Sequence, residues 1–260
     1  MQNGEFITNR LMVGIIRSIC QERGIGFSSM SDDWILELIK DKKIKRVIGY
    51  NFSLNDAVSA AIAKDKVATH VILKEAAIPS VPHVLLRPKV STAQKQAIEQ
   101  WQNIVVKPLE GTSGEGVKLV KDPEEAVEWV ESTGISAWAA SPFIDVLREL
   151  RFVLLDQEPL VVFEKQAVII DGLKMFNLGK GATSKDIEPS TDLVRLAAEA
   201  QAALGLRLSA VDIVEAIDGT YQVLEVNSGF MMEHYMRASD ENYKTAIRAY
   251  NRIVSAVMEA

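Results

Sequence analysis

The segment 105–120, VVKPLEGTSGEGVKLV, contains the residue types that commonly surround a phosphate group in proteins. Three glycines and two small hydroxyl residues lie between two short runs of β-forming residues. Glycine allows backbone N–H groups to turn inward and approach an anion closely. We therefore expect a glycine-rich loop that folds over ATP phosphates, with Lys107 reaching from the preceding strand. An ordinary hairpin with a mobile loop is the alternative for this segment taken alone.

The spacing within this segment excludes two common phosphate-binding motifs. Gly111 and Gly116 are spaced as in the first half of a P-loop, but Val117 stands where that motif needs lysine. A strand, rather than a helix, is expected to follow. The segment is thus neither a P-loop nor a Rossmann turn.

A second group of candidate residues lies in SAVDIVEAIDGTYQVLEVNSG, residues 209–229, where two strands can pair through the Asp218-Gly219 turn. Strand alternation places Glu225 and Asn227 on one face, and Asp212 on the partner strand can face the same way. Two carboxylates and one amide oxygen suit Mg²⁺, which prefers oxygen ligands. A carboxylate on a solvated face is the alternative. His70, His83 and His234 lack the spacing of zinc ligands, and we expect structural roles for them. His234 follows the proposed metal strand closely.

The elements that must position these groups alternate between helices and strands, which indicates an α/β fold. Apolar periodicity and turn residues predict the helices at 9–23, 31–42, 54–64, 65–76, 91–101, 122–132 and 191–204, with a long last helix from Asp240. Runs of β-forming residues predict the strands at 45–50, 78–88, 103–108, 117–120, 150–155 and 160–170, with two more in 209–229. We find no internal repeat and no low-complexity linker, so the parts of the chain are expected to share interfaces.

Composition restricts the classes of function. The 260 residues are 48% hydrophobic, enough for a full core, and the net charge is 29 − 35 = −6 with both signs mixed along the chain. This pattern does not predict a nucleic-acid partner. The single cysteine, Cys20, lies in an apolar helical stretch, so we expect a core residue and a reducing compartment. No basic N-terminal region with a long apolar run and no apolar stretch of about 18 residues occurs, which predicts a cytoplasmic protein without a membrane partner.

Taken in order, these motifs resemble the ATP-grasp superfamily over about residues 64–230. The resemblance rests on Lys66 in AKDKVATHVILKEAAIPSVP, Lys107 in VVKP, the glycine loop, the strand ending in SPFI, Arg151, Asn177, Asp212 and LEVNSG. It is strongest for the branch that contains the ribosomal-protein glutamate ligase and other amino-acid and peptide ligases. Residues 1–63 match only loosely, as a reduced pre-ATP-grasp domain.

The resemblance implies a role for each matching position. Lys66 and Lys107 would contact the phosphates of ATP, and the loop would cover them through Glu110, Gly111, Thr112, Ser113, Gly114 and Gly116. The hinge strand would hold adenine and ribose through Pro142, Phe143, Ile144 and Asp145. The catalytic groups beside the reacting carboxylate would be Arg151, Lys165 and Asn177. The Mg²⁺ ligands would be Asp212, Glu225 and Asn227, in agreement with the strand argument above.

The sequence also departs from the family pattern. Ser141-Pro142 stands where relatives often carry Gln-Glu, which removes one backbone donor for adenine. Glu149 replaces the aspartate of the Asp-x-Arg motif, and Lys165 stands where relatives often have arginine. Arg151 and Lys165 could instead be surface charges on β-strands.

The resemblance implies an ATP-grasp fold of three subdomains. These are a pre-ATP-grasp-like region at 1–89, a lid with the glycine loop at 90–145 and a metal-carrying unit at 146–260. The implied activity is an ATP- and Mg²⁺-dependent carboxylate–amine ligase that forms an acyl phosphate, with two Mg²⁺ ions and Mn²⁺ as a substitute. Its substrates would be small-molecule or peptide carboxylates and amines, and a homo-oligomer is allowed. A kinase, an ATP-grasp ligase with another nucleophile and a non-catalytic nucleotide-binding regulator are the alternatives.

Overall fold

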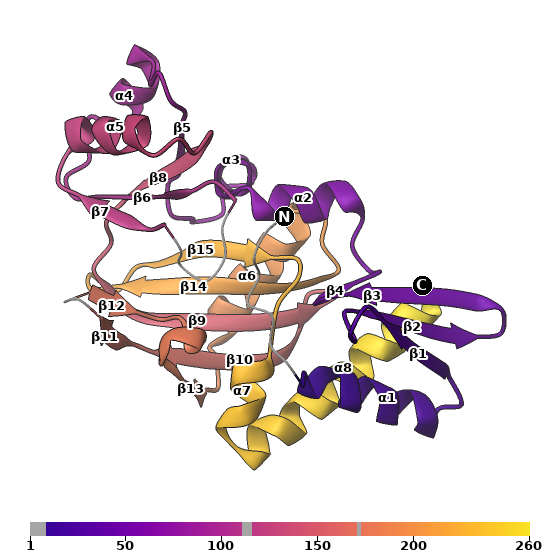
Figure 1. Cartoon of the computed structure of the whole chain (residues 1–260). Coiled ribbons are helices and arrows are strands. Elements are labelled where there is room, and N and C mark those ends of the chain that lie inside the picture. Colours follow the sequence, from indigo (N-terminus) through magenta and orange to yellow (C-terminus); the bar gives the residue numbers. More distant parts are fainter. Residues whose placement is uncertain (1–8, 111–115, 171–172) are drawn as a thin grey trace.

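A five-stranded antiparallel sheet forms the centre of the molecule in the computed structural model, which describes residues 9–110, 116–170 and 173–260 (Figure 1). The strand order is β13-β10-β9-β14-β15. The strands are β9 (Val146–Leu155), β10 (Glu158–Gln166), β13 (Thr183–Asp186), β14 (Leu208–Ala216) and β15 (Tyr221–Asn227). The long β9 and β14 lie next to each other, so residues far apart in sequence come together in the middle of the sheet.

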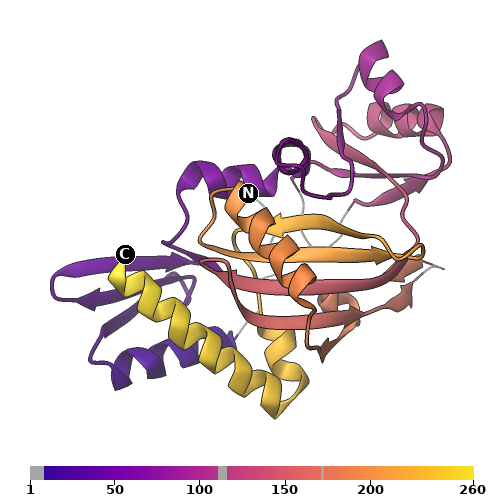
Figure 2. The ribbon, with the colours of Figure 1, turned by 180° about the vertical axis from the view of Figure 1, so that it is seen from behind.

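One face of this sheet is covered by helices, as the view from behind shows (Figure 2). These are α2 (Ala57–Lys64), α3 (Lys66–Glu75) and α6 (Thr191–Ala203). Alternate side chains of the strands, among them Phe152, Val211 and Ile213, pack with Leu73 and Ala197 in this layer. The side chains between them therefore point to the opposite face, where the candidate site lies.

A smaller sheet with two helices stands above the central sheet and forms the lid (Figure 1). Its strand order is β5-β8-β6-β7, and it begins before residue 90 because β5 belongs to it. The lid elements are β5 (Val84–Leu86), α4 (Thr92–Ile98), β6 (Ile104–Pro108), β7 (Lys118–Val120), α5 (Pro123–Ser132) and β8 (Trp138–Pro142). The lid has a separate apolar core around Val106, Val130 and Trp138.

The N-terminal region forms a helix and a four-stranded antiparallel sheet, which pack against the last helix, α8 (Asp240–Glu259). The elements are α1 (Leu11–Glu22), β1 (Gly26–Met30), β2 (Ile35–Lys40), β3 (Lys43–Ile48) and β4 (Asn51–Phe52). The predicted helix at 31–42 is wrong, because Ser31, Asp32 and Asp33 adopt positive φ angles of 54°, 54° and 61° and turn the chain into β2. The predicted strand at 45–50 exists as β3, but only Val47 within β3 is buried.

The helices predicted at 122–132 and 191–204 are confirmed as α5 and α6, and Cys20 is confirmed as a core residue. Asp122 caps α5 by accepting a hydrogen bond from the Glu125 N–H at 2.9 Å, and Pro123 is the first helical residue. Helix α6 ends at Gly205, whose φ of +67° suits glycine. Cys20 is fully buried, and burial raises the pKa of its thiol to about 11.

The remaining elements lie between β10 and β13 in the sequence or come after β15. They are β11 (Val168–Ile170), β12 (Leu173–Met175), the 3₁₀ turn η1 (Leu178–Lys180) and α7 (Glu233–Ala238). Asp171 and Gly172 lie outside the described residues. Within the described parts of the chain, no helix combines the length and the apolar character needed to cross a bilayer.

Candidate active site

A row of functional side chains crosses the central sheet. The strand register places Arg151 of β9 opposite Asp212 of β14, and Asp212 opposite Glu225 of β15. Two residues along, Glu149 of β9 lies opposite Lys165 of β10. Because alternate residues of a strand share a face, these five side chains face the same side of the sheet.

A β-bulge in β15 sets the face of the sheet on which Glu225 lies. The register between β14 and β15 shifts between Asp212 and Ile213, so one extra residue is accommodated in β15 at this point. Val223 and Val226 consequently both enter the helix-covered core. Glu225 and Asn227 face the other side, and the Asn227 Nδ2 donates to Glu225 Oε1 at 3.1 Å.

The centre of the row is a buried network of ion pairs. Arg151 contacts Asp212 through two bonds, Nε to Oδ1 at 2.7 Å and Nη2 to Oδ2 at 2.6 Å. The Lys165 ammonium lies 3.1 Å from Asp212 Oδ1 and also pairs with Glu149. Burial alone would raise the pKa of Asp212, but Arg151 and Lys165 together hold this pKa well below its usual range. Asp212 therefore stays ionised, with its charge offset by two cations.

Glu149 was not predicted from the sequence as a site residue. Burial raises the pKa of its carboxyl group, while the neighbouring Lys165 opposes the rise. Its position could have been found from two signals, the i, i+2 spacing to Arg151 and the basic Lys165 on the next strand. Arg151 and Lys165 are partners of buried carboxylates in this structure, rather than surface charges.

The residues predicted to bind Mg²⁺ carry oxygen atoms, the ligand type that a hard cation prefers. Asp212, Glu225 and Asn227 supply two carboxylates and an amide oxygen. Among the described residues, no group of three or more His, Cys, Asp or Glu is arranged to hold a metal. The predicted set contains two acids, Asp212 and Glu225.

Two lysines come from outside the central sheet, Lys107 from the lid strand β6 and Lys66 from α3. Burial lowers the pKa of Lys107 in β6 to about 8, although the Glu225 and Glu149 carboxylates oppose this. Lys66, the first residue of α3, donates from Nζ to the Leu109 carbonyl at 3.4 Å. Lys66 lowers the pKa of Lys107 further, so charged groups of both the central sheet and α3 act on the Lys107 ammonium.

The glycine segment is described only at its ends. Glu110 is exposed, and Gly116 has φ +69° with Pro108 atoms 3.0 and 3.2 Å from the position of an added Cβ. Glycine is therefore required at 116 both by the backbone conformation and by the Pro108 ring. The other predicted loop residues, Gly111, Thr112, Ser113 and Gly114, lie outside the described residues.

The hinge residues connect β8 to β9. The Phe143 N–H donates to the Asn103 carbonyl at 2.7 Å, so this donor already has a partner. The Asp145 carboxylate is exposed and lies 3.6 Å from Lys174 Nζ. Pro142 and Ile144 are partly buried at the same bend.

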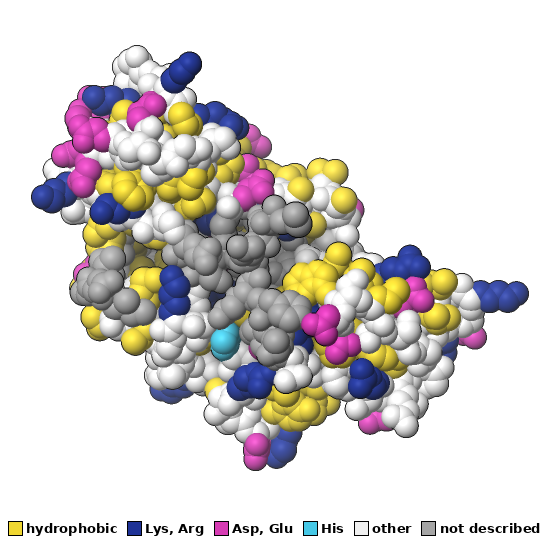
Figure 3. Space-filling view, viewed as in Figure 1, with side chains coloured by type: hydrophobic (Ala, Val, Ile, Leu, Met, Phe, Trp, Pro, Cys, Tyr) yellow, Lys and Arg dark blue, Asp and Glu magenta, His cyan; other side chains and the backbone are white. Residues whose placement is uncertain are grey.

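Two further residues singled out in the sequence, Asn177 and His234, make no hydrogen bond or ion pair with this network among the contacts of the described residues. The Asn177 side chain accepts from the Gly179 N–H at 2.7 Å and caps η1, a local role. His234 is in α7, and its buried Nε2 has no hydrogen-bond partner within the described part of the chain. Figure 3 shows the surface from the same side as Figure 1, and the acidic and basic side chains of the described residues are interspersed there.

Comparison with known proteins agrees with this geometry. The chain is 30% identical over 208 residues to a probable alpha-L-glutamate ligase of Haemophilus influenzae, covering 78% of this chain and 67% of the relative. The D-alanine–D-alanine ligase of Bacillus anthracis complexed with ATP shares the fold, with a TM-score of 0.62, 18% identity, and coverage of 79% and 70%.

The ATP-grasp ligase PsnB complexed with a minimal precursor also has this fold. Its TM-score is 0.57 at 16% identity, with 76% of this chain and 64% of that chain covered. The chain thus spans about two thirds of the length of these proteins. Residues 63–250 match the model of the RimK-like ATP-grasp domain, and the chain belongs to the RimK-like ATP-grasp family.

Proposed function

We propose that this protein is an ATP- and Mg²⁺-dependent ligase that joins a carboxylate to an amine through an acyl-phosphate intermediate. The observation that carries the proposal is the row Arg151–Asp212–Glu225 on the central sheet, coupled by charge to Lys107 in the lid. Cations together with carboxylate and amide oxygens of the kind that Mg²⁺ prefers suit the transfer of a phosphoryl group. Family membership supports the ligase assignment.

In the proposed reaction, a carboxylate oxygen of the substrate attacks the γ-phosphorus of ATP, and ADP leaves. The amine then attacks the acyl carbon, inorganic phosphate leaves, and the amine loses a proton. Lys66 and Lys107 hold the phosphates, while Arg151 and Lys165 orient the carboxylate and offset the charge on the acyl phosphate. Asp212, Glu225 and Asn227 would hold Mg²⁺, which would supply Lewis-acid chemistry at this site.

Arg151 would have to give up part of its contact with Asp212 for the proposed reaction to proceed. Both Oδ atoms of Asp212 accept hydrogen bonds from Arg151. A cation bound to Asp212 would repel Arg151 and free its guanidinium for a substrate carboxylate or phosphate. Metal binding and substrate orientation would therefore be linked through one carboxylate.

The substrate is proposed to be an amino acid or a peptide. The relatives bear the name glutamate ligase, and PsnB is described with a precursor. The first experiment measures ADP release over panels of amino acids and peptides, with hydroxylamine added to trap an acyl phosphate as the hydroxamate. The expected result is ADP and hydroxamate formation that depends on both ATP and a carboxylate.

Arg151→Ala tests the assignment of residues. We expect its turnover to fall far more than its affinity for ATP, because a cation beside the transferring phosphoryl group matters most as charge develops. A phosphorylated alcohol in place of the hydroxamate would identify a kinase and overturn the ligase proposal. Unchanged turnover in Arg151→Ala would remove Arg151 from the reaction.

A further inference from the structure

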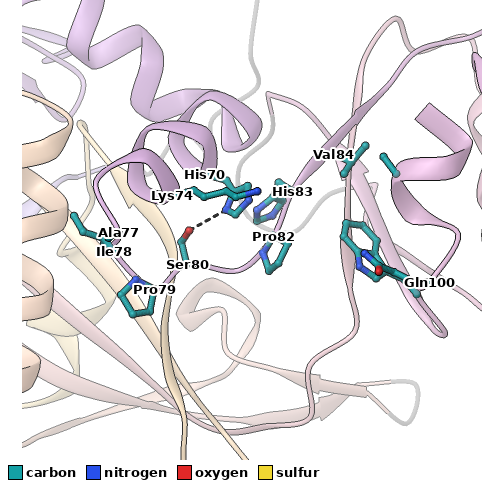
Figure 4. A pocket seen from close by; sticks show the side chains of 12 residues that line it. His70, Lys74, Ala77, Ile78, Pro79, Ser80, Pro82, His83, Val84 and Gln100 are labelled. Atoms are coloured by element: carbon teal, nitrogen blue, oxygen red, sulfur yellow. Dashed lines mark hydrogen bonds between the residues drawn. The ribbon is translucent and has the colours of Figure 1, made fainter. Parts of the chain in front are cut away.

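A groove of about 630 Å³ lies where the lid joins the body of the protein, and we call it the hinge groove (Figure 4). It is bounded by the end of α3, the segment 77–82, β5, and the residues at the end of α4. Its lining residues are His70, Lys74, Ala77, Ile78, Pro79, Ser80, Pro82, His83, Val84, Ala97, Gln100 and Trp101. None of these residues is assigned to the proposed reaction.

The hinge groove connects two parts of the molecule. Its body side is fixed to the central sheet, because the Val81 N–H donates to the Val223 carbonyl and the Val223 N–H donates to the Pro79 carbonyl, each at 2.9 Å. Its lid side is supplied by Val84, Gln100 and Trp101. A molecule that fills the groove would contact both sides of the hinge.

The lining has one apolar part and one polar part. Prolines, Ile78, Val84 and the Trp101 ring form the apolar part. Lys74, His70, Ser80 and His83 form the polar part, where the Lys74 side chain extends toward both imidazole rings (Figure 4). No aspartate or glutamate is among the described lining residues, so the Lys74 ammonium leaves the groove positively charged.

Both histidines are held neutral by this environment. Burial lowers the pKa of His70, and the nearby Lys74 lowers it further. Burial also lowers the pKa of His83 well below its usual value, and the charge of Lys107 adds to this effect. His83 thus lines the hinge groove and also senses the charge of a lysine of the proposed phosphate site.

His83 also has an unused polar atom. Its Nδ1 lies 2.9 Å from the Val81 carbonyl, an acceptor only, so Nδ1 carries the proton and Nε2 bears the lone pair. The side chain is 4% exposed, and Nε2 has no hydrogen-bond partner among the described residues. A buried polar atom without a partner costs free energy, which an occupant with an N–H group could recover.

We propose that the hinge groove is a second ligand site, which binds a small carboxylate with an apolar body and an amide N–H, of the size of an N-acyl amino acid. The carboxylate would lie beside Lys74, and the apolar body would pack on Trp101 and the prolines. The volume is within the range of small-molecule sites. Because an occupant touches lid and body together, it stabilises one lid position and changes the affinity of the cleft for ATP.

The test uses N-acetyl-L-leucine as the probe and N-acetyl-L-leucinamide as the uncharged control. The chain has only three histidines, so their imidazole resonances can be assigned from single His→Gln variants. We expect N-acetyl-L-leucine to shift the His70 and His83 resonances in a saturable manner, while His234 serves as the internal control. The amide should bind at least about tenfold more weakly, equivalent to roughly 1.4 kcal/mol.

Lys74→Gln should weaken probe binding by a similar factor, and Lys64→Gln, a change of another exposed lysine, should leave it unaltered. Thermal melts of both variants check the fold. Equal binding of acid and amide, an effect of Lys64→Gln as large as that of Lys74→Gln, or shifts confined to His234 would overturn the proposal, as would no shift at saturating probe. The readout needs no ATP turnover, so its failure is separate from failure of the ligase proposal.

Discussion

At the scale of residues, the candidate site consists of opposite charges that are held at short distance before any ligand arrives. Asp212 is fully buried, and it is stable there because Arg151 and Lys165 both contact it. Removing one member of such a network leaves a buried charge without a partner. The loss in folding stability for buried ion pairs is typically about 3–5 kcal/mol. Substitutions that keep shape but change charge are therefore the informative ones.

Glu225→Gln is expected to reduce ADP formation at least about a hundredfold, equivalent to roughly 2.7 kcal/mol of transition-state stabilisation. The amide keeps the shape of the side chain but removes the charge that would offset Mg²⁺ beside the γ-phosphate. Initial rates across a magnesium titration measure the effect, with melts in the absence of metal as a check of folding. Glu164→Gln is the matched control, since Glu164 is on the other face of the sheet and pairs with Arg148. Near wild-type rates in Glu225→Gln would contradict the metal assignment.

Lys107 is expected to give ATP binding a pH dependence in the weakly alkaline range. In the free protein the pKa of Lys107 is about 8, so the ammonium is charged below this pH and loses its proton above it. Phosphate binding favours the charged form, so ATP affinity is constant below pH 8 and falls by up to about tenfold per pH unit above it. Calorimetry at pH 8 in two buffers of different ionisation enthalpy should detect proton uptake on binding. Lys107→Arg should abolish this uptake, and uptake that persists in the variant would assign it to another group.

At the scale of elements, the sequence predicts those parts of the fold that local signals determine. Asp122-Pro123 marks the start of α5 and Gly205 the end of α6, because capping and positive φ depend on a few neighbouring residues. The segment 31–42 was mistaken for a helix, since Ser31 and the following acids resemble an N-cap. Its Leu36 and Leu38 alternate toward the core as in a strand.

The candidate site is predictable in its residue types but not in its pairing. Alternation along β15 indicates a shared face for Glu225 and Asn227. The bulge that keeps this face, and the contact of Arg151 with Asp212, depend on the register between strands that are distant in sequence. Arg151 and Asp212 were accordingly assigned to different ligands, although the structure joins them directly.

Gly116→Ala is expected to destabilise the lid by about 1–2 kcal/mol more than an ordinary surface change, because a positive φ is costly for alanine. An added Cβ would also lie 3.0 Å from Pro108. Gly134→Ala is the matched control within the lid, since Gly134 has φ +70° but no atom within 4 Å of the added Cβ. Both variants carry the cost of a positive φ, so the additional loss of protection in Gly116→Ala, measured by hydrogen exchange of β6 and β7, reports the Pro108 contact. Equal hydrogen-exchange protection in the two variants would show that the Pro108 contact does not affect the stability of the lid.

At the scale of the whole molecule, the N-terminal region is integrated with the C-terminal half. Glu233 of α7 is fully buried and accepts hydrogen bonds from the Leu11 and Met12 N–H groups, at 2.9 and 3.1 Å, at the start of α1. The Asn55 side chain accepts from the Arg207 and Leu208 N–H groups at 2.9 and 3.0 Å, and donates to the Leu208 carbonyl at 2.7 Å. A residue of the N-terminal region thus holds the start of β14, the strand that carries Asp212.

The family match begins at residue 63, yet a chain of residues 63–260 is expected not to fold to a native state. Met12, Ile16 and Leu36 of the N-terminal region share one apolar core with Phe163 and Ile253. Exposing a buried side chain of this size costs about 1.5–3 kcal/mol, and the loss of several exceeds the usual stability of a domain.

Near-ultraviolet circular dichroism and binding of a hydrophobic dye measure the outcome, and the expected result is lost aromatic signal with strong dye binding. Adding residues 1–62 as a separate peptide should restore the signal, because it supplies the missing half of the core without a covalent link. A shortened chain that melts cooperatively near the wild-type Tm would show that the ATP-grasp portion is an independent unit. The N-terminal sheet would then be an appended domain, and Asn55 would have no part in placing the strand that bears Asp212.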